Sequence, residues 1–152
     1  MVPTYIIGKI TYIDNDYLIL ENNGQGIIIY TPDIKRFKKD ETRKLFISTM
    51  NSEYESTIYG FDSLKELILF EDLIFTNGIG PKKAMKLLDI GWKTIANWLA
   101  DNYRDKIHSI TYISPRAWGD ISDYYSKKYQ KWIENNFDPR LDNYWGPSWN
   151  NE

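Results

Sequence analysis

The chain has 152 residues, enough for one substantial core or two small ones. It is 42% hydrophobic, 26% charged and 16% aromatic, so we expect it to fold. The sequence contains no apolar run of roughly 18 residues, so no membrane span is predicted. No signal peptide is evident. The absence of cysteine excludes disulfides, thiolate zinc sites and a cysteine nucleophile. Together these features predict a cytoplasmic protein.

Residues 1–61 are expected to form a small β-barrel. Five short segments are rich in β-branched and aromatic residues, and Asn, Asp, Gly and Pro separate them. The expected strands are residues 5–13, 17–20, 27–30, 44–48 and 52–59. Five strands in this length fit a closed barrel of the OB type, and a five-stranded SH3-like barrel is the alternative.

From residue 62 the apolar residues recur with a helical period, which predicts a helical domain over residues 62–136. The segment Ser63 to Glu66 matches a capping box, and Pro81 suits the first turn of a second helix. Two further helices are expected, over residues 94–102 and from about residue 115. The fold class is therefore α+β, a barrel followed by an all-helical domain.

Residues 137–152 show no period and are interpreted as an aromatic-rich tail. Trp145 and Trp149 in this tail could dock on the body, seal an oligomer interface or anchor a partner.

Charge is distributed unevenly although the formal net charge is only −2. Residues 1–62 carry seven Lys or Arg and nine Asp or Glu, whereas residues 77–131 carry ten basic and five acidic residues. The excess of basic residues makes a phosphate-facing helical region plausible, although Lys-rich helix faces are usually just solvated.

The segment from Asn77 to Lys83, with the sequence Asn-Gly-Ile-Gly-Pro-Lys-Lys, is the most informative one. Two glycines around an apolar residue allow a tight turn and close approach of a ligand. The helix that follows begins with unpaired N–H groups and a partial positive charge, which suits a phosphate. An ordinary turn between two helices is the alternative. A dinucleotide-binding loop is not expected, since the third glycine and a preceding strand are missing.

This segment, together with Tyr59-Gly60-Phe61 and Ile7-Gly8-Lys9-Ile10, resembles the RuvA family of Holliday-junction-binding proteins. The similarity spans roughly residues 5–132. The resemblance implies an OB-like barrel, two helix-hairpin-helix motifs, a homotetramer and sequence-independent binding to four-way DNA junctions in recombination and repair.

The resemblance also implies roles for individual residues. The residues of the first phosphate-binding hairpin would be Gly78, Ile79, Gly80, Lys82 and Lys83. The loop before Tyr59 would carry the acidic residues that face the junction centre. Glu53 occupies the first of those positions, Tyr54 replaces the second, and Glu55 lies beside it. Solvated strand carboxylates are the alternative.

The second hairpin of the family falls at residues 110–116, where this chain departs from the pattern. Tyr112 and Ser114 replace both glycines, while Pro115 and Arg116 still suit a helix start with a cation. We expect a weakened second site with Arg116 as its remaining contact. The sequence also ends before the family's third domain, which argues against coupling to a RuvB-type motor.

No catalytic activity, cofactor or metal is predicted. The only histidine, His108, has no evident partner in the sequence, so we expect a structural or surface residue. The acids show no metal-ligand spacing. Two other functions remain open. The first is an oligomeric adaptor that has lost DNA binding. The second is a single-strand-binding barrel that uses Tyr12, Tyr17 and Tyr30.

Overall fold

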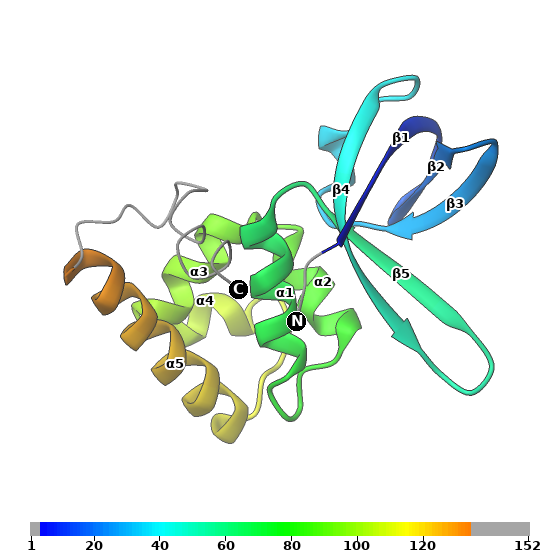
Figure 1. Ribbon diagram of the computed structural model, residues 1–152. Coiled ribbons are helices and arrows are strands. Elements are labelled where there is room, and N and C mark those ends of the chain that lie inside the picture. The colour runs from blue at the N-terminus through cyan, green and yellow to red at the C-terminus, as the bar shows by residue number, and fades with distance from the viewer. Residues whose placement is uncertain (1–3, 135–152) are drawn as a thin grey trace. The chain divides into compact units, whose positions relative to one another are not determined.

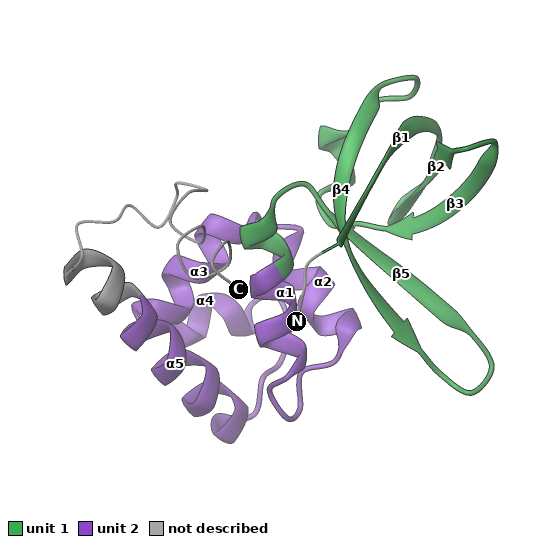
Figure 2. Cartoon of the chain, in the orientation of Figure 1, with its two compact units in different colours: residues 1–67 green, residues 68–152 purple. Residues whose placement is uncertain are grey.

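A computed structural model describes the backbone of residues 4–134 and the side chains of residues 4–128. The chain divides into two compact units, residues 1–67 and residues 68–152 (Figure 2). All five strands lie in the first unit and most of the helical residues in the second, so the expected α+β class is confirmed (Figure 1). Trp145 and Trp149 lie outside the described residues.

The first unit is a closed five-stranded barrel, as the sequence predicted. Its strands are β1 (Thr4–Ile13), β2 (Tyr17–Asn22), β3 (Gln25–Tyr30), β4 (Thr42–Asn51) and β5 (Ser56–Phe61), with a short 3₁₀ helix η1 (Ile34–Arg36). The strand order is β1-β2-β3-β5-β4, and neighbours are antiparallel except for β3 and β5. Each strand thus pairs with two neighbours, which covers the sheet edges wherever these pairings run.

Alternation along the strands places one set of apolar side chains inside the barrel. The core consists of Ile10, Leu18, Leu20, Ile29, Phe37 and Leu45. Gly60 makes this packing possible, because a Cβ atom at that position would collide with the side chain of Ile29. The alternate side chains of β2 and β3 face outward.

The predicted fifth strand begins too early. Residues 52–55 form the turn between β4 and β5 instead, since the Ser52 N–H donates to the Glu55 carbonyl oxygen at 2.8 Å. The Ser52 hydroxyl also accepts the Glu55 N–H at 3.2 Å, which closes the turn. Polar residues that looked like strand alternation therefore belong to a hairpin loop.

The helices are α1 (Leu64–Ile74), α2 (Pro81–Leu88), α3 (Trp92–Ala100), α4 (Arg104–His108) and α5 (Pro115–Glu134). The sequence did not predict α4, because its five residues are too few to show a helical period. None of the helices in the described range is long and apolar enough to cross a membrane.

The second unit buries an apolar core and is tied together by side-chain hydrogen bonds from α5. The Ser122 hydroxyl donates to the Leu99 carbonyl oxygen at 2.9 Å, and Trp118 Nε1 donates to Asn102 Oδ1 at 2.7 Å. These contacts hold α5 against α3.

A second contact fixes α5 to α1. The Tyr125 hydroxyl donates to Asp72 Oδ2 at 2.6 Å, and Lys128 Nζ lies 3.3 Å from the same oxygen. Because α1 precedes one hairpin turn and α5 follows another, these contacts join the helices that carry the two turns.

Candidate nucleic-acid interface

The turn between α1 and α2 is built around a buried isoleucine. The Ile79 side chain is only 3% exposed, and its N–H donates to the Thr76 carbonyl oxygen at 3.1 Å. Gly78, just before it, has a φ of +93°, a conformation that glycine adopts without strain. Ile79 therefore anchors the turn through its side chain, while the two flanking glycines stay exposed at the surface.

The N-terminus of α2 is left open by this turn. Gly80 is the N-cap residue and offers no side chain to accept the first N–H groups of the helix. Pro81 follows at the first helical position. The N–H groups of Lys82 and Lys83 belong to the first turn, where no helical carbonyl precedes them. An anion there would meet backbone donors, the positive end of the helix and the exposed Lys82.

The second turn, between α4 and α5, also has a buried isoleucine and a helix-starting proline, but a side chain caps its helix start. Ile113 is fully buried, as Ile79 is, and Pro115 again begins the helix. Here, however, the Ser114 hydroxyl accepts the Ala117 N–H at 3.2 Å. One donor of the helix start is thus satisfied from within the chain, in the way of an ordinary N-cap.

Tyr112 takes the place that Gly78 has in the first turn. It is not among the described residues with positive φ, so the two turns differ in backbone conformation. Its side chain is 60% exposed and occupies the surface where a backbone could otherwise approach. These two differences support the prediction of a weakened second site.

The two turns lie next to each other within the helical unit. A methyl group at Gly78 would lie 3.7 Å from Ala117 Cβ and 3.8 Å from Ser114 Oγ. Lys83 Nζ lies 5.8 Å from the centre of the Tyr112 ring, within the range of a cation–π contact. Lys83 is therefore partly engaged by the second turn, whereas Lys82 and Arg116 are exposed.

His108 has partners that the sequence did not indicate. Its Nε2 atom lies 2.7 Å from the Ile113 carbonyl oxygen, and its ring lies 5.1 Å from the Tyr112 ring. Arg104 Nη2 donates to the same carbonyl oxygen at 3.5 Å. No partner was evident in the sequence because α4 brings His108 and Arg104 against the second turn, and these contacts fit the expected structural role of His108. Both residues hold the turn in shape.

The acidic residues predicted to face a junction lie on the loop between β4 and β5. Glu53 and Glu55 are both exposed, and Tyr54 between them is 90% exposed. The loop belongs to the barrel unit and the two turns belong to the helical unit.

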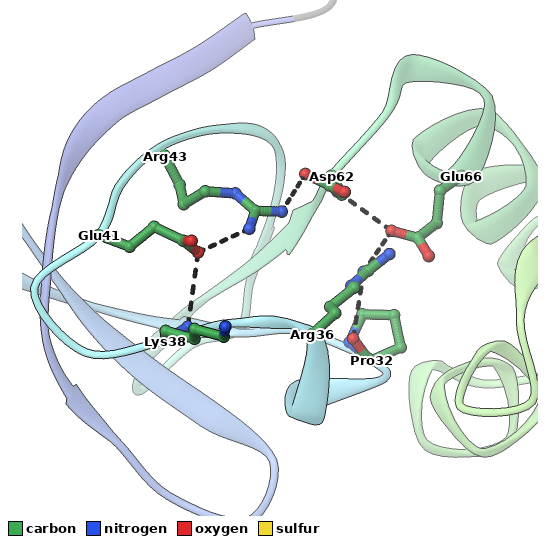
Figure 3. Close-up of polar contacts among 7 residues, drawn as sticks. All are labelled: Pro32, Arg36, Lys38, Glu41, Arg43, Asp62 and Glu66. Carbon is green, nitrogen blue, oxygen red and sulfur yellow. Dashed lines mark hydrogen bonds and ion pairs between the residues drawn. The ribbon is translucent and has the colours of Figure 1, made fainter.

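A chain of ion pairs, which no sequence pattern indicated, joins the barrel to the start of α1 (Figure 3). Arg36 Nη2 donates to Glu66 Oε1 at 2.7 Å, and Glu66 Oε1 also accepts the Asp62 N–H at 3.1 Å. Arg43 bridges Glu41 and Asp62, at 2.7 Å and 2.5 Å.

Glu66 is almost completely buried, with a side chain that is 1% exposed. Burial raises the pKa of the Glu66 carboxyl, while the hydrogen bond and charge of Arg36 act in the opposite direction. The capping box is confirmed in part. The Ser63 hydroxyl accepts the Glu66 N–H at 3.2 Å, but the Glu66 carboxylate reaches back to Asp62 and not to Ser63. These contacts fix the residues that lead into the helix before the first turn.

Among the described residues, no group of three or more His, Asp or Glu side chains is placed to hold a metal ion. The chemistry of the two turns is that of hydrogen-bond donors and cations, which suits binding of an anionic backbone.

Two family models match the two units. Residues 4–60 match the RuvA N-terminal domain, and residues 70–123 match a SAM-like helix-hairpin-helix tandem. The helix-hairpin-helix match contains both turns described above.

Several curated proteins are similar to the chain over most of its length. A protein of Metamycoplasma arthritidis, named Holliday junction branch migration complex subunit RuvA, is 45% identical over 86% of this chain and 64% of its own length. Proteins of the same name from Mesomycoplasma hyopneumoniae and Mycoplasmopsis synoviae are 42% and 38% identical over 86% of this chain. The matches cover 59% and 66% of those two proteins. The chain thus spans less than two thirds of these relatives.

Proposed function

Because the chain belongs to the RuvA family, we propose that it binds four-way DNA junctions and contacts their phosphates mainly through the turn between α1 and α2. The contacts would come from the backbone at Gly78 and Gly80 and from the side chains of Lys82 and Lys83. Such contacts read the sugar-phosphate backbone and no base, so binding would not depend on sequence.

The observation that carries this proposal is the difference between the two helix starts. No side chain satisfies the first N–H groups of α2, which follows Gly80, whereas the Ser114 side chain satisfies one at the start of α5. An open helix start with an adjacent lysine suits a phosphate. We therefore assign the main contact to the first turn and a supporting contact to Arg116 at the second.

One turn per subunit makes few contacts, and several copies around one junction would multiply them. A homotetramer fits the four arms of a junction, and the relatives are named as subunits of a complex. Glu53 and Glu55 would then repel phosphates near the crossover and help to keep the arms apart. The chain would act in the cytoplasm without catalytic activity, and any motor activity would belong to a partner.

The test is a titration of a four-way junction, a matched linear duplex and a single strand with the Lys82→Gln/Lys83→Gln double variant. Each charge-assisted contact contributes about 1.5–3 kcal/mol, so we expect junction affinity to fall at least about tenfold. The Lys86→Gln/Lys93→Gln variant is the matched control, because both lysines are exposed on the same unit. Equal losses in both variants would contradict an assignment to the first turn.

An adaptor without DNA binding is the second candidate function. The net charge of −2 and the capped second helix start favour it. A wild-type protein that assembles into oligomers but binds neither the junction nor the duplex would support the adaptor and exclude the junction-binding proposal.

A further inference from the structure

Four tyrosine rings form a continuous row across the outer surface of the barrel. The rings of Tyr12 and Tyr17 are 6.2 Å apart, those of Tyr17 and Tyr30 are 5.6 Å apart, and those of Tyr30 and Tyr59 are 6.2 Å apart. The strand register produces this row, since Tyr17 pairs with Tyr30 and Tyr30 with Tyr59. The row therefore crosses β1, β2, β3 and β5. We call these four residues the tyrosine row.

Apolar side chains extend this surface along the strands. Ile19 and Ile28 form the cross-strand pair one outward position further along β2 and β3. Ile28 is 51% exposed and Tyr12 is 48% exposed. Tyr17, Tyr30 and Tyr59 are half-buried. A group of partly exposed aromatic and aliphatic side chains on one face of a sheet is a common feature of binding surfaces.

The Tyr12 end of the tyrosine row contacts a carboxylate. The Tyr12 hydroxyl donates to Asp14 Oδ2 at 3.2 Å, and Asp14 also interacts with the Tyr17 hydroxyl. Partial desolvation and the Asp14 carboxylate raise the pKa of Tyr17. At the other end, partial burial raises the pKa of Tyr59, with Tyr30 and Glu55 adding to the effect. The row thus has a carboxylate in contact at its Tyr12 end, and the charge of Glu55 acts on Tyr59 at the other end.

This arrangement selects the kind of ligand. The face of an aromatic ring carries a negative electrostatic potential, which attracts ammonium and guanidinium groups. Carboxylates at both ends strengthen that attraction and repel phosphates. A single-stranded nucleic acid needs cations beside its stacking surface, so the observed charges disfavour it here.

Elsewhere on the barrel, a lysine of the chain itself makes cation–π contacts with aromatic rings. Lys44 Nζ lies 4.4 Å from the centre of the Tyr5 ring and 5.1 Å from the centre of the Phe46 ring. Tyr5 is 53% exposed and lies on β1, which makes it a matched comparison for the tyrosine row.

We propose that the tyrosine row is a docking site for a basic, arginine-bearing segment of a partner protein. Guanidinium groups would stack on the rings, and Asp14 and Glu55 would pair with neighbouring cations. Arginine would bind more tightly than lysine, because its planar group stacks on aromatic faces and is more weakly hydrated. The proposal concerns a different unit from the phosphate-binding turn, and it does not depend on junction binding.

The experiment measures fluorescence anisotropy of a labelled peptide of alternating arginine and glycine, titrated with the full chain. Tyr17→Leu/Tyr30→Leu keeps the surface apolar but removes two rings, and we expect roughly fivefold weaker binding or more. Asp14→Asn leaves every ring in place and should weaken binding about twofold or more. The Tyr5→Leu variant is the control, and it should bind the peptide as the wild type does.

Further measurements separate this proposal from its competitors. Lysine and glutamate peptides of the same length should bind less tightly than the arginine peptide, and junction affinity of the tyrosine variants should be unchanged. Peptide affinity that is equal in the wild type, Tyr17→Leu/Tyr30→Leu and Asp14→Asn would overturn the proposal. Oligothymidine binding that is lost in the tyrosine variant would overturn it in favour of a nucleic-acid surface. Loss of oligomerisation in that variant would overturn it in favour of a contact between subunits.

Discussion

Gly78 and Gly80 flank the same buried isoleucine, yet they should respond differently to alanine. Gly78 has a φ of +93°, where a side chain costs roughly 1–2 kcal/mol, so Gly78→Ala should lower stability as well as junction affinity. Gly80 has a φ of −93°, and no atom lies within 4 Å of the position that a Cβ would take, so Gly80→Ala should fold normally.

Gly80→Ala therefore separates an effect on DNA binding from an effect on stability. If a DNA backbone approaches this glycine closely, the added methyl group should weaken junction binding several-fold while the melting temperature stays unchanged. Thermal unfolding and gel-shift titration of both variants, with Gly119→Ala as a control at another open position, provide the measurement. Wild-type affinity in Gly80→Ala would show that no ligand approaches Gly80.

For individual residues, the sequence predicted the first turn well and the second only in outline. Gly-Ile-Gly-Pro specifies a turn followed by a helix start, and the structure has both. The replacement of the second pair of glycines was evident, but the action of Ser114 as a cap was not. A serine before a proline is compatible with several turn geometries, and only the backbone shows which N–H group its hydroxyl reaches.

Among the elements, the start of α1 depends on one buried ion pair. Removing its cation with Arg36→Met would leave the Glu66 carboxylate buried without its counter-charge, which costs about 3–5 kcal/mol at neutral pH. The exposed neighbour Lys35 provides the control variant Lys35→Met, for which we expect little change. Urea unfolding of both variants measures the difference.

The loss of unfolding free energy in Arg36→Met should depend on pH in a defined direction. Burial already raises the pKa of Glu66, and removal of the arginine raises it further. A carboxyl with a raised folded pKa favours folding at low pH, and this contribution is lost as the pH rises through the folded pKa. The difference in unfolding free energy between the wild type and Arg36→Met should therefore be smallest below the ordinary glutamate pKa of 4.5 and largest at neutral pH. A deficit that grows in acid would contradict this assignment.

Elements with a clear pattern were predicted, and elements that depend on distant contacts were not. The long helices α1 and α5 show their apolar period in the sequence. By contrast, α4 has five residues and is stabilised by the turn that it supports, through His108 and Arg104. Pairing of Arg36 with Glu66 joins residues 30 positions apart, and no local pattern contains that information.

For the whole molecule, salt dependence can count the subunits that engage one junction. The logarithm of affinity falls with the logarithm of salt concentration by about 0.9 per phosphate neutralised. Loss of Lys82 and Lys83 should therefore reduce the slope by about 1.8 for each engaged subunit. We expect a reduction that exceeds this value, measured by junction titrations of wild type and Lys82→Gln/Lys83→Gln over a range of salt concentrations.

The Lys86→Gln/Lys93→Gln variant again provides the comparison, because general screening of the protein's charge would change both slopes alike. A reduction of about 1.8 or less in the Lys82→Gln/Lys83→Gln variant would mean that a single first turn engages the junction.

The order of barrel and helices followed from the change in hydrophobic period near residue 62, so the architecture was predictable. The participation of Tyr59 in the tyrosine row was not. Its place beside Tyr30 depends on the parallel pairing of β3 and β5, which brings together segments separated by a whole strand. A sequence pattern shows which residues face outward, but not which of them become neighbours when a sheet closes.

That closing pair has a consequence for how the barrel opens. β3 and β5 are paired in register at Tyr30 and Tyr59 alone, whereas every other strand pair has four or more registered partners. Backbone pairing therefore stabilises the barrel least at this seam between β3 and β5, where the Tyr30 and Tyr59 rings lie side by side. Breathing of the native barrel should therefore begin there, and amide protons flanking the seam should exchange with deuterated solvent before those between β1 and β4.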